Sequence, residues 1–567
     1  MSKLAAHRSR TRGSWPTHDI GLQGHTLLAA ITACSALGFL LVGYDNGVMG
    51  GILETAAFKR SFGNPDAALV GNIVSIYEIG CFIGALASFS IGSPLGRCRT
   101  ILLGATILQV GAIIQGACSS VAVLILGRVV AGVGMGLINS TVPILLTECS
   151  PARDKGIFSR GKLVAVSLTI LNCGIVLSYW TDYGFNFSGL TGTVTWRFPI
   201  LAQSFFIIGI FLIAAVIPDT PRWYLARGRD QEALAVLARL ANKGEEDDEV
   251  QDQYSQIKQA IAHEKEAAKH TNTFLTLLSP GGKGRDDAVR TRRRLLLACF
   301  IQAAQQLGGI NALIYYSSTL FSQSLKLGNK QSAQLAGGLN MVLILGAFVS
   351  IFLVDRLGRK PLLLSCISAM SLVFIVQTVL VKKIQEGTAS RSDSHGAVAM
   401  LFLFELFFSV GFQATVWMIP SEVLPLSIRT RGSALSTASN WICNFAVVKF
   451  TPSALENIGW RTYALFAVFN AAWVPIIAVF LPETKGLTLE EVDEIFSTDD
   501  FKLHHDHDGH DGSGQGKGRD GTSGMPTLPL TERTTRMATE DSDGDGKDDA
   551  KSGNSVLTRT KSAGQAA

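Results

Sequence analysis

Apolar segments of about 20 residues divide the chain, and the charged residues are gathered into the short stretches between them. A helix of about 20 residues crosses the roughly 30 Å hydrocarbon core of a bilayer, and inside that core backbone amides must be satisfied within helices or a closed barrel. The sequence therefore predicts an all-α membrane protein with twelve transmembrane helices, six in each half. The predicted spans are residues 26–48, 70–92, 100–119, 121–146, 160–181, 198–217, 293–323, 335–355, 361–383, 397–420, 431–451 and 460–481.

The composition argues against several other classes of protein. Only 17% of the 567 residues are charged and 47% are hydrophobic, whereas soluble domains carry about 25% charged residues. The net charge of +5 is small and scattered, so it does not indicate a nucleic-acid partner. The nine cysteines show no spacing typical of a metal site, and we find no nucleophile motif or phosphate-binding loop. We therefore expect no metal, no cofactor and no enzyme activity.

Lysine and arginine are more frequent in the short loops on one side of the predicted spans, which is the cytoplasmic side by the positive-inside rule. An even number of spans then places both termini in the cytoplasm, and we expect the plasma membrane as the location. The expected organisation is a cytoplasmic N-terminal segment at 1–25, a six-helix half at 26–217, a cytoplasmic linker with short helices at 218–292, a second half at 293–481, and a mostly disordered cytoplasmic tail at 482–567.

The two halves repeat short sequences at matching places. The matched pairs are Gly96-Arg97 with Gly358-Arg359 after the second and eighth spans, Glu148 to Pro151 with Glu422 to Pro425 after the fourth and tenth, and Pro218-Asp219-Thr220 with Pro482-Glu483-Thr484 after the sixth and twelfth. Three matches at equivalent positions indicate a duplicated half. Duplicated halves that rock around a central site are typical of secondary transporters.

These motifs, together with Ser178-Tyr179-Trp180, Trp196 to Pro199 and Ser436 to Trp441, resemble those of the major facilitator superfamily, sugar porter family. The resemblance covers about residues 25–496. Within the family, the chain is similar to the fungal branch that includes glycerol/proton symporters and sugar and polyol permeases. It implies the major facilitator fold of two pseudo-symmetric halves and proton symport of a sugar or polyol. A facilitative uniporter, an exporter of another metabolite and a transport-deficient nutrient sensor are the alternatives. The expected partners are the solute, protons and the lipid bilayer, with the protein as a monomer.

Asp45 and Arg128 fall inside predicted spans. A charged side chain at mid-membrane costs on the order of 2.5–3.5 kcal/mol, so each should face the interior with a partner. We expect the two to pair, and the resemblance makes Asp45 the proton acceptor and Arg128 its partner. The alternative is that both only anchor helix ends. Glu78 is either a structural acid or a secondary proton site, and Glu405 is expected to be structural.

The seventh predicted span carries several amides and Tyr315 around Gly308-Gly309, where the helix can bend. Amides and phenols both donate and accept hydrogen bonds, which suits a neutral polyol. The resemblance places the sugar site at Gln305, Gln306, Asn311, Trp417, Asn440 and Trp441. For any single residue, an interhelical hydrogen bond or a packing role is the alternative.

Two departures from the family pattern affect this site. Leu168 stands where many hexose porters have glutamine, and residues 411–416 replace a proline-rich turn. A hydroxyl that lacks its partner costs affinity. A smaller or different polyol, or a less polar compound, is therefore a plausible substrate.

Charges at the predicted cytoplasmic face recur in both halves. The expected gate residues are Arg97, Glu148 and Arg160 in the first half, and Asp355, Arg356, Glu422 and Arg431 in the second. Glu148 is expected to pair with Arg97 and Arg160, and Glu422 with Arg356 and Arg431. The resemblance implies that salt bridges between the halves hold this gate shut. The alternative is that these charges only set the orientation in the membrane.

Overall fold

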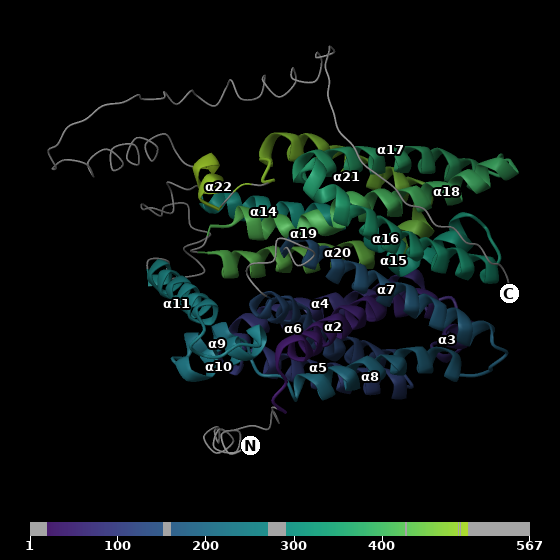
Figure 1. The fold of residues 1–567 in the computed structure, drawn as a ribbon. Helices are drawn as coiled ribbons and strands as arrows, with labels where there is room; N and C mark the ends of the chain where they lie inside the picture. The colour runs from purple at the N-terminus through teal and green to yellow at the C-terminus, as the bar shows by residue number, and fades with distance from the viewer. Residues whose placement is uncertain are drawn as a thin grey trace, which may run out of the picture. The chain divides into compact units, whose positions relative to one another are not determined.

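The computed structural model describes residues 20–150, 160–269, 291–425, 428–485, 487 and 489–496. Within these ranges every regular element is a helix, as Figure 1 shows. The all-α prediction is therefore confirmed. The N-terminal residues 1–19 and the tail beyond 496 lie outside the described residues, so the expectation of a disordered tail stays a prediction.

The first half consists of six long helices and one short one. They are α2 (Gly24–Ile52), α3 (Ala56–Ser61), α4 (Ala67–Leu95), α5 (Arg97–Ala117), α6 (Val121–Cys149), α7 (Arg160–Phe187) and α8 (Val194–Ala214). The long helices have 21 to 29 residues, and at 1.5 Å per residue each is long enough to cross a bilayer.

The second half repeats this pattern, but two of its spans are interrupted. Its elements are α14 (Thr291–Leu307), α15 (Ile310–Thr319), the π-helix η1 (Leu320–Ser324), α16 (Asn329–Leu357), α17 (Arg359–Gln385), α18 (Arg391–Phe407), the π-helix η2 (Phe408–Gln413), α19 (Ala414–Val423), α20 (Arg429–Asn457) and α21 (Arg461–Phe480). The break between α14 and α15 lies at Gly308-Gly309, where Gly309 has a φ of +96°. A π-helix inside a span is frequent at functional sites.

Ten of the spans in the described part of the chain are long and apolar enough to cross a membrane. The two remaining predicted spans, α7 and α20, are helices of 28 and 29 residues. Both lie where the halves meet, because α7 packs against α16 and α20 packs against α4. Their polar side chains can therefore face the interior instead of lipid.

Glycines let the helices of the first half approach one another closely. A Cβ atom on Gly132 of α6 would lie 2.3 Å from the Tyr77 carbonyl oxygen of α4, and one on Gly134 would lie 2.4 Å from the Leu108 nitrogen of α5. Side chains at these positions would force the helices apart. This contact matches the small-residue packing typical of membrane helices.

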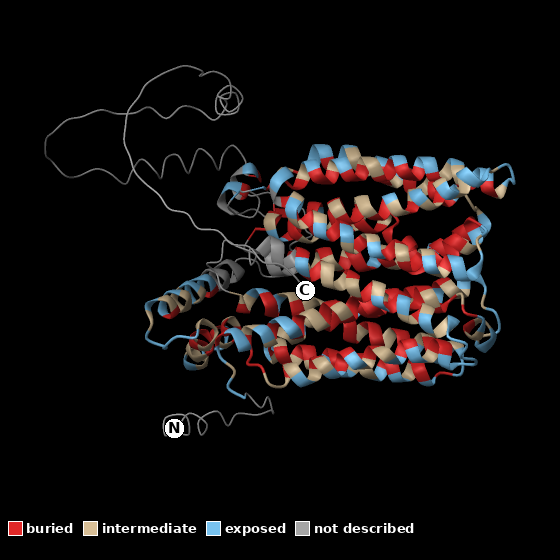
Figure 2. Ribbon diagram, turned by 45° about the vertical axis from the view of Figure 1, so that its right-hand side comes forward, coloured by how far each residue is buried: buried red, intermediate tan, exposed pale blue. Residues whose placement is uncertain are grey.

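Large apolar side chains cover the outer faces of the helices, where Figure 2 shows exposed positions in pale blue. Phe205 and Val479 are among the most exposed, at 76% and 71%. Exposed apolar side chains on this scale are expected where lipid, and not water, surrounds the protein.

Four more helices, of 6 to 22 residues, lie in the linker and after the last span. They are α9 (Pro221–Ala226), α10 (Asp230–Ala241), α11 (Asp248–Lys269) and α22 (Leu489–Phe496). Arg239 of α10 donates to the Leu22 carbonyl oxygen at 2.9 Å, which ties the linker to the start of α2.

Candidate functional site

A cavity of about 220 Å³ lies between the two halves. At about 30 Å³ for each water molecule it could hold roughly seven waters, so its size fits a small solute. The first half contributes Phe39, Val42, Leu168, Leu171, Asn172 and Ile175, among others, and the second contributes Gln305, Gln306, Asn311, Gln413, Trp417, Asn440, Trp441 and Asn444. Among the described residues there is no group of three or more His, Cys, Asp or Glu side chains that could hold a metal ion.

The structure brings six of the seven predicted substrate residues to this cavity. Four of them are amides that form a buried network. Gln306 Nε2 donates to Asn440 Oδ1 at 3.0 Å, and Asn440 Nδ2 donates to Gln305 Oε1 at 3.0 Å. Asn311 Nδ2 donates to Gln306 Oε1 at 2.5 Å. The network joins α14, α15 and α20, so it holds the amides in fixed orientations toward a ligand.

Two further amides of this network were missed in the sequence. Asn440 Nδ2 also donates to Gln302 Oε1 at 2.7 Å, and Asn311 Nδ2 donates to Asn444 Oδ1 at 2.6 Å. Gln302 lies one turn before Gln306, and Asn444 lies one turn after Asn440. Residues four apart share a helix face, so this spacing was a usable signal.

The two predicted tryptophans, Trp417 and Trp441, both line the cavity. The Trp441 indole nitrogen is buried, and it has no hydrogen-bond partner among the described residues. A buried N–H without a partner costs free energy unless a ligand or water accepts from it. A ligand or water that reached this nitrogen would relieve that cost.

Tyr315, the seventh predicted residue, does not line the cavity. Its hydroxyl lies 2.7 Å from Glu78 Oε1 and 3.0 Å from Asn46 Oδ1. Both partners belong to the first half, whereas Tyr315 belongs to α15 of the second. The tyrosine therefore joins the halves and lies outside the lining of the cavity.

A reciprocal amide pair also joins the halves at the cavity wall. Asn172 Nδ2 of α7 donates to Gln413 Oε1 of η2 at 2.9 Å, and Gln413 Nε2 donates back to Asn172 Oδ1 at 2.6 Å. Asn172 Nδ2 also donates to the Leu343 carbonyl oxygen at 3.0 Å, and Ser409 Oγ donates to Gln413 Oε1 at 2.9 Å. No signal in the sequence links two residues that are 241 positions apart.

The predicted ion pair lies beside this region. Arg128 Nη1 lies 3.7 Å from Asp45 Oδ1, and the two side chains are 0% and 1% exposed. Arg128 Nη2 donates to the Val74 carbonyl oxygen at 3.2 Å, and its guanidinium lies 4.4 Å from the centre of the Tyr77 ring. Arginine over an aromatic face is attracted to it. The structure thus places Asp45 and Arg128 together in the interior, as expected from the cost of leaving either charge alone.

One end of the bundle, here called the Glu54 end, is joined across the halves. Thr319 of α15 donates to Glu54 Oε1 at 2.7 Å, and Ser317 donates to the Tyr179 hydroxyl of α7 at 2.9 Å. Tyr179 in turn donates to the Ile314 carbonyl oxygen. With the Tyr315 contacts, these hydrogen bonds close the cavity toward the Glu54 end.

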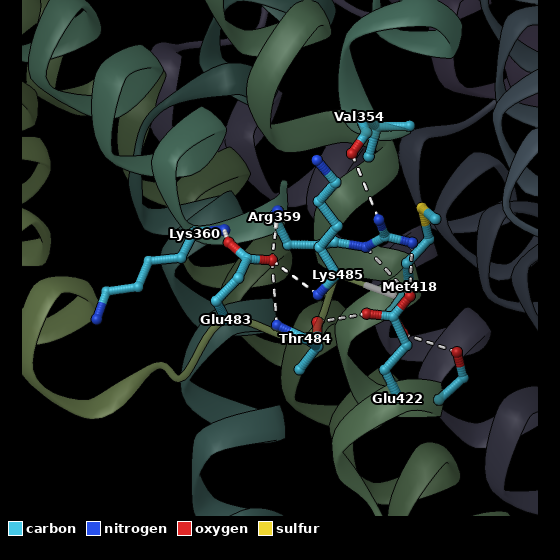
Figure 3. A network of polar contacts seen from close by, with 9 residues as sticks. Val354, Arg359, Lys360, Met418, Glu422, Glu483, Thr484 and Lys485 are labelled. Carbon is cyan, nitrogen blue, oxygen red and sulfur yellow. Dashed lines mark hydrogen bonds and ion pairs between the residues drawn. The ribbon is translucent and has the colours of Figure 1, made fainter. Parts of the chain in front are cut away.

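The opposite end, here called the Arg97 end, carries a charged cluster in each half. Figure 3 shows the cluster of the second half, in which Arg359 donates to Glu422 Oε1 at 3.0 Å and Thr484 donates to Glu422 Oε2 at 2.6 Å. The Arg359 backbone amide donates to Glu483 Oε1 at 2.9 Å. These contacts fix the start of α17 against α19 and the segment after α21.

The first half repeats these three contacts. Arg97 donates to Glu148 Oε1 at 2.9 Å, Thr220 donates to Glu148 Oε2 at 2.6 Å, and the Arg97 backbone amide donates to Asp219 Oδ1 at 2.9 Å. Burial raises the pKa of Asp219, and hydrogen bonds from the backbone amides of Arg97 and Thr220 act in the opposite direction. The repeated sequences thus encode repeated geometry.

The predicted gate residues have mixed outcomes. Arg97 and Glu148 pair as expected, but Glu422 is paired with Arg359 in place of Arg356. Arg356 is exposed, and its carbonyl oxygen accepts from Lys485 Nζ at 2.7 Å. The pairs of Glu148 with Arg97 and of Glu422 with Arg359 each lie within one half, and Glu148 also lies 3.9 Å from Arg222 of the linker. The side chains of Arg160, Asp355 and Arg431 lie outside the described residues.

The chain is similar to known transporters over most of its length. Residues 31–496 match the family model described as sugar (and other) transporter. An MFS-type transporter, oryC, of Aspergillus oryzae is 35% identical over 84% of this chain and 86% of its own. The sugar transporter STL1 of Saccharomyces cerevisiae is 34% identical over 85% of this chain and 83% of its own.

A solved structure shares the fold. The proton:xylose symporter XylE, bound to 6-bromo-6-deoxy-D-glucose, superposes with a TM-score of 0.67 at 21% identity. The match covers 83% of this chain and 99% of XylE. The major facilitator fold that the motifs predicted is therefore confirmed.

Proposed function

The chain belongs to the sugar transporter family, and we propose that it is a secondary active transporter that carries a small polyhydroxylated solute across a membrane by proton symport with alternating access. The observation that carries this proposal is the buried pair of Asp45 and Arg128 beside an amide-lined cavity. A carboxylate and a guanidinium inside a membrane protein typically mark an ion or proton pathway.

The ion pair supplies the coupling in this proposal. While Arg128 lies beside it, Asp45 stays ionised, because an opposite charge favours the charged form. When the pair separates, burial favours the protonated form, and Asp45 takes a proton. Protonation and the rearrangement of the halves are then linked, so a proton gradient can drive the solute uphill. XylE is a proton symporter with the same fold, which supports this assignment.

The cavity supports a solute that is less hydroxylated than a hexose. The amide network lies on α14, α15 and α20 of the second half, whereas the wall contributed by the first half combines the apolar Val42, Leu168 and Leu171 with the polar side chains of Asn46, Asn139, Thr147, Ser167 and Asn172. Asn172, an amide on that wall, already makes hydrogen bonds to Gln413 and Leu343. A solute with hydroxyls on one face and a less polar opposite face matches this arrangement.

We assign the Arg97 end to the cytoplasm, since it carries most of the short-loop Lys and Arg residues. The Glu54 end then faces outward, and the state described is closed to the outside. Both termini, the linker and the tail are cytoplasmic in this assignment. We place the protein in the plasma membrane as a monomer, with the linker at 218–292 and the two halves at 26–217 and 293–481.

The test is uptake of a labelled panel into transporter-deficient cells, with and without a protonophore. The panel contains glucose, xylose, glycerol, galactose, lactose and quinate. We expect accumulation of at least one member above the external concentration, abolished by the protonophore. Uptake that only equilibrates and ignores the protonophore would favour the facilitative alternative. Binding without any uptake would favour a nutrient sensor.

A further inference from the structure

Two carboxylic acids and one guanidinium are buried in the same part of the first half. Asp45 is 1% exposed, and Glu78 and Arg128 are 0% exposed. If both acids were ionised, the group would carry one net negative charge in the interior of a membrane protein, which is costly. One additional proton makes the group neutral. The closed state described here is therefore expected to hold a proton on one of the two acids.

The contacts of the two acids differ. Asp45 faces Arg128 at 3.7 Å, so its negative charge is already opposed by a positive one. Glu78 Oε1 instead contacts the Tyr315 hydroxyl at 2.7 Å, and the same hydroxyl lies 3.0 Å from Asn46 Oδ1. Neither oxygen of Asp45 has a hydrogen-bond partner among the described residues, so it is the nearby guanidinium of Arg128 that favours a proton on Glu78 over one on Asp45.

Counting hydrogens around Tyr315 supports the same placement. A phenol has one hydrogen to donate, and it cannot serve Glu78 Oε1 and Asn46 Oδ1 together. If Glu78 is protonated, it donates to Tyr315, and Tyr315 donates to Asn46, so both contacts are satisfied. If Glu78 is ionised, it accepts the hydrogen of Tyr315. The contact with Asn46 is then satisfied only if the Asn46 side-chain amide is flipped, so that its NH2 group donates to the Tyr315 oxygen. The pH experiment below separates these two arrangements.

The contact with Tyr315 exists only while the halves are together at the Glu54 end. Tyr315 belongs to α15 of the second half, and Glu78 and Asn46 belong to α4 and α2 of the first. Its neighbours on α15, Ser317 and Thr319, also make hydrogen bonds across the halves. Opening this end would withdraw Tyr315 and admit water to Glu78.

Other titratable and polar groups also face Glu78. Arg128 of α6 and Asp45 of α2 are its charged neighbours, and α20 contributes the amide of Asn444. Its own helix contributes Cys81, and α15 contributes Tyr316 next to Tyr315. Arg128 is the only cation of this set, and it is shared between two acids.

We propose that Glu78 is a second proton-binding site, which holds a proton while the Glu54 end is closed and releases it to water when Tyr315 withdraws. In the closed state, the carboxyl O–H of Glu78 donates to Tyr315. On opening, that O–H bond breaks, the proton passes to entering water, and the carboxylate remains. This inference rests on the proposed transport function, and it adds a link between protonation and one gate.

The test measures how far the Glu54 end is open at different pH, without substrate. Ser318→Cys serves as the reporter, because Ser318 is 3% exposed and lies on α15 between the two residues that bridge the halves. A membrane-impermeant maleimide is added from the Glu54 side, and labelling of the nine native cysteines, measured in the chain without the reporter, is subtracted. The reporter variant must first show uptake like that of the wild type.

In the reporter chain, labelling should rise with pH, by up to about tenfold per pH unit, which is the limit for one linked proton. Glu78→Gln keeps a donor for Tyr315 but cannot ionise, so its labelling should be low at every pH. Tyr315→Phe removes the bridging hydroxyl, so its labelling should be high and nearly independent of pH. Monodisperse elution in detergent verifies that each variant is folded.

A Glu78→Gln variant that keeps the pH profile of the reporter chain would overturn the proposal. If Asp45→Asn lost the pH profile and Glu78→Gln kept it, the proton would be on Asp45. That result would also overturn the proposal. This experiment is independent of symport. If proteoliposomes showed no proton-driven accumulation but labelling still depended on Glu78, the transport mechanism would fail while the Glu78 site stood.

Discussion

The amide pair between Asn172 and Gln413 gives a prediction with a definite sign. Replacing Asn172 with Leu removes the partner of Gln413 Nε2, whereas Gln413 Oε1 keeps the contact with the Ser409 hydroxyl, whose one hydrogen is shared with the Leu343 carbonyl oxygen. Replacing Gln413 with Met removes the partner of Asn172 Oδ1, whereas Asn172 Nδ2 keeps the Leu343 carbonyl. Each single variant thus leaves one buried polar atom without a partner, which costs about 1–3 kcal/mol.

The double variant Asn172→Leu/Gln413→Met leaves neither atom behind. We therefore expect it to be about as stable as the wild type, with a coupling energy of about 2–6 kcal/mol in a double-mutant cycle, which is the sum of the two single losses. For a cooperative unit the size of one half, each kcal/mol corresponds to a shift of roughly 2–4 °C in Tm.

The assay is thermal unfolding of the four purified chains in the same detergent. The wild type and the double variant should unfold at similar temperatures, and both single variants should unfold lower. Losses that simply add in the double variant would refute the reasoning, because they would mean that the two amides do not satisfy each other.

Three further predictions concern transport. Trp441→Phe removes an indole donor, which costs one neutral hydrogen bond of about 1 kcal/mol. The apparent KM for uptake should therefore rise roughly fivefold, with little change in kcat. An unchanged KM would mean that the solute does not accept a hydrogen bond from this group. Leu168→Gln adds an amide to the apolar wall and should raise the apparent affinity for hexoses by a similar factor, as competition uptake would measure. Gly309→Ala should reduce the uptake rate of surface-expressed protein at least tenfold. Gly309 has a φ of +96°, and a Cβ atom added to it would lie only 2.9 Å from the Phe466 ring. Uptake at the wild-type rate would show that the break after α14 is not needed.

Much of the fold follows from the sequence because the membrane allows few solutions. Apolar length alone located the spans, and the cost of an isolated charge paired Asp45 with Arg128 in advance. The cavity amides were also found in part, since residues one turn apart share a face. Gln302 and Asn444 could have been added by extending that spacing.

The contacts between the halves could not be predicted in the same way. Tyr315 and Glu78 are 237 residues apart, and which of their groups meet depends on the conformational state of the two halves. The error at Arg356 is different, because the repeat already contained the answer. Gly96-Arg97 aligns with Gly358-Arg359, and Gly358 ends α16 with a φ of +93°, so Arg359 begins the next helix toward Glu422.

Proton-driven accumulation in proteoliposomes tests the central claim most directly. With the substrate identified from the uptake panel, wild-type protein under an inward proton gradient should concentrate the solute. Asp45→Asn should lose that accumulation but retain exchange of labelled for unlabelled solute. If Asp45→Asn still concentrated the solute against its gradient, Asp45 would not be the coupling carboxylate, and the mechanism proposed here would be contradicted.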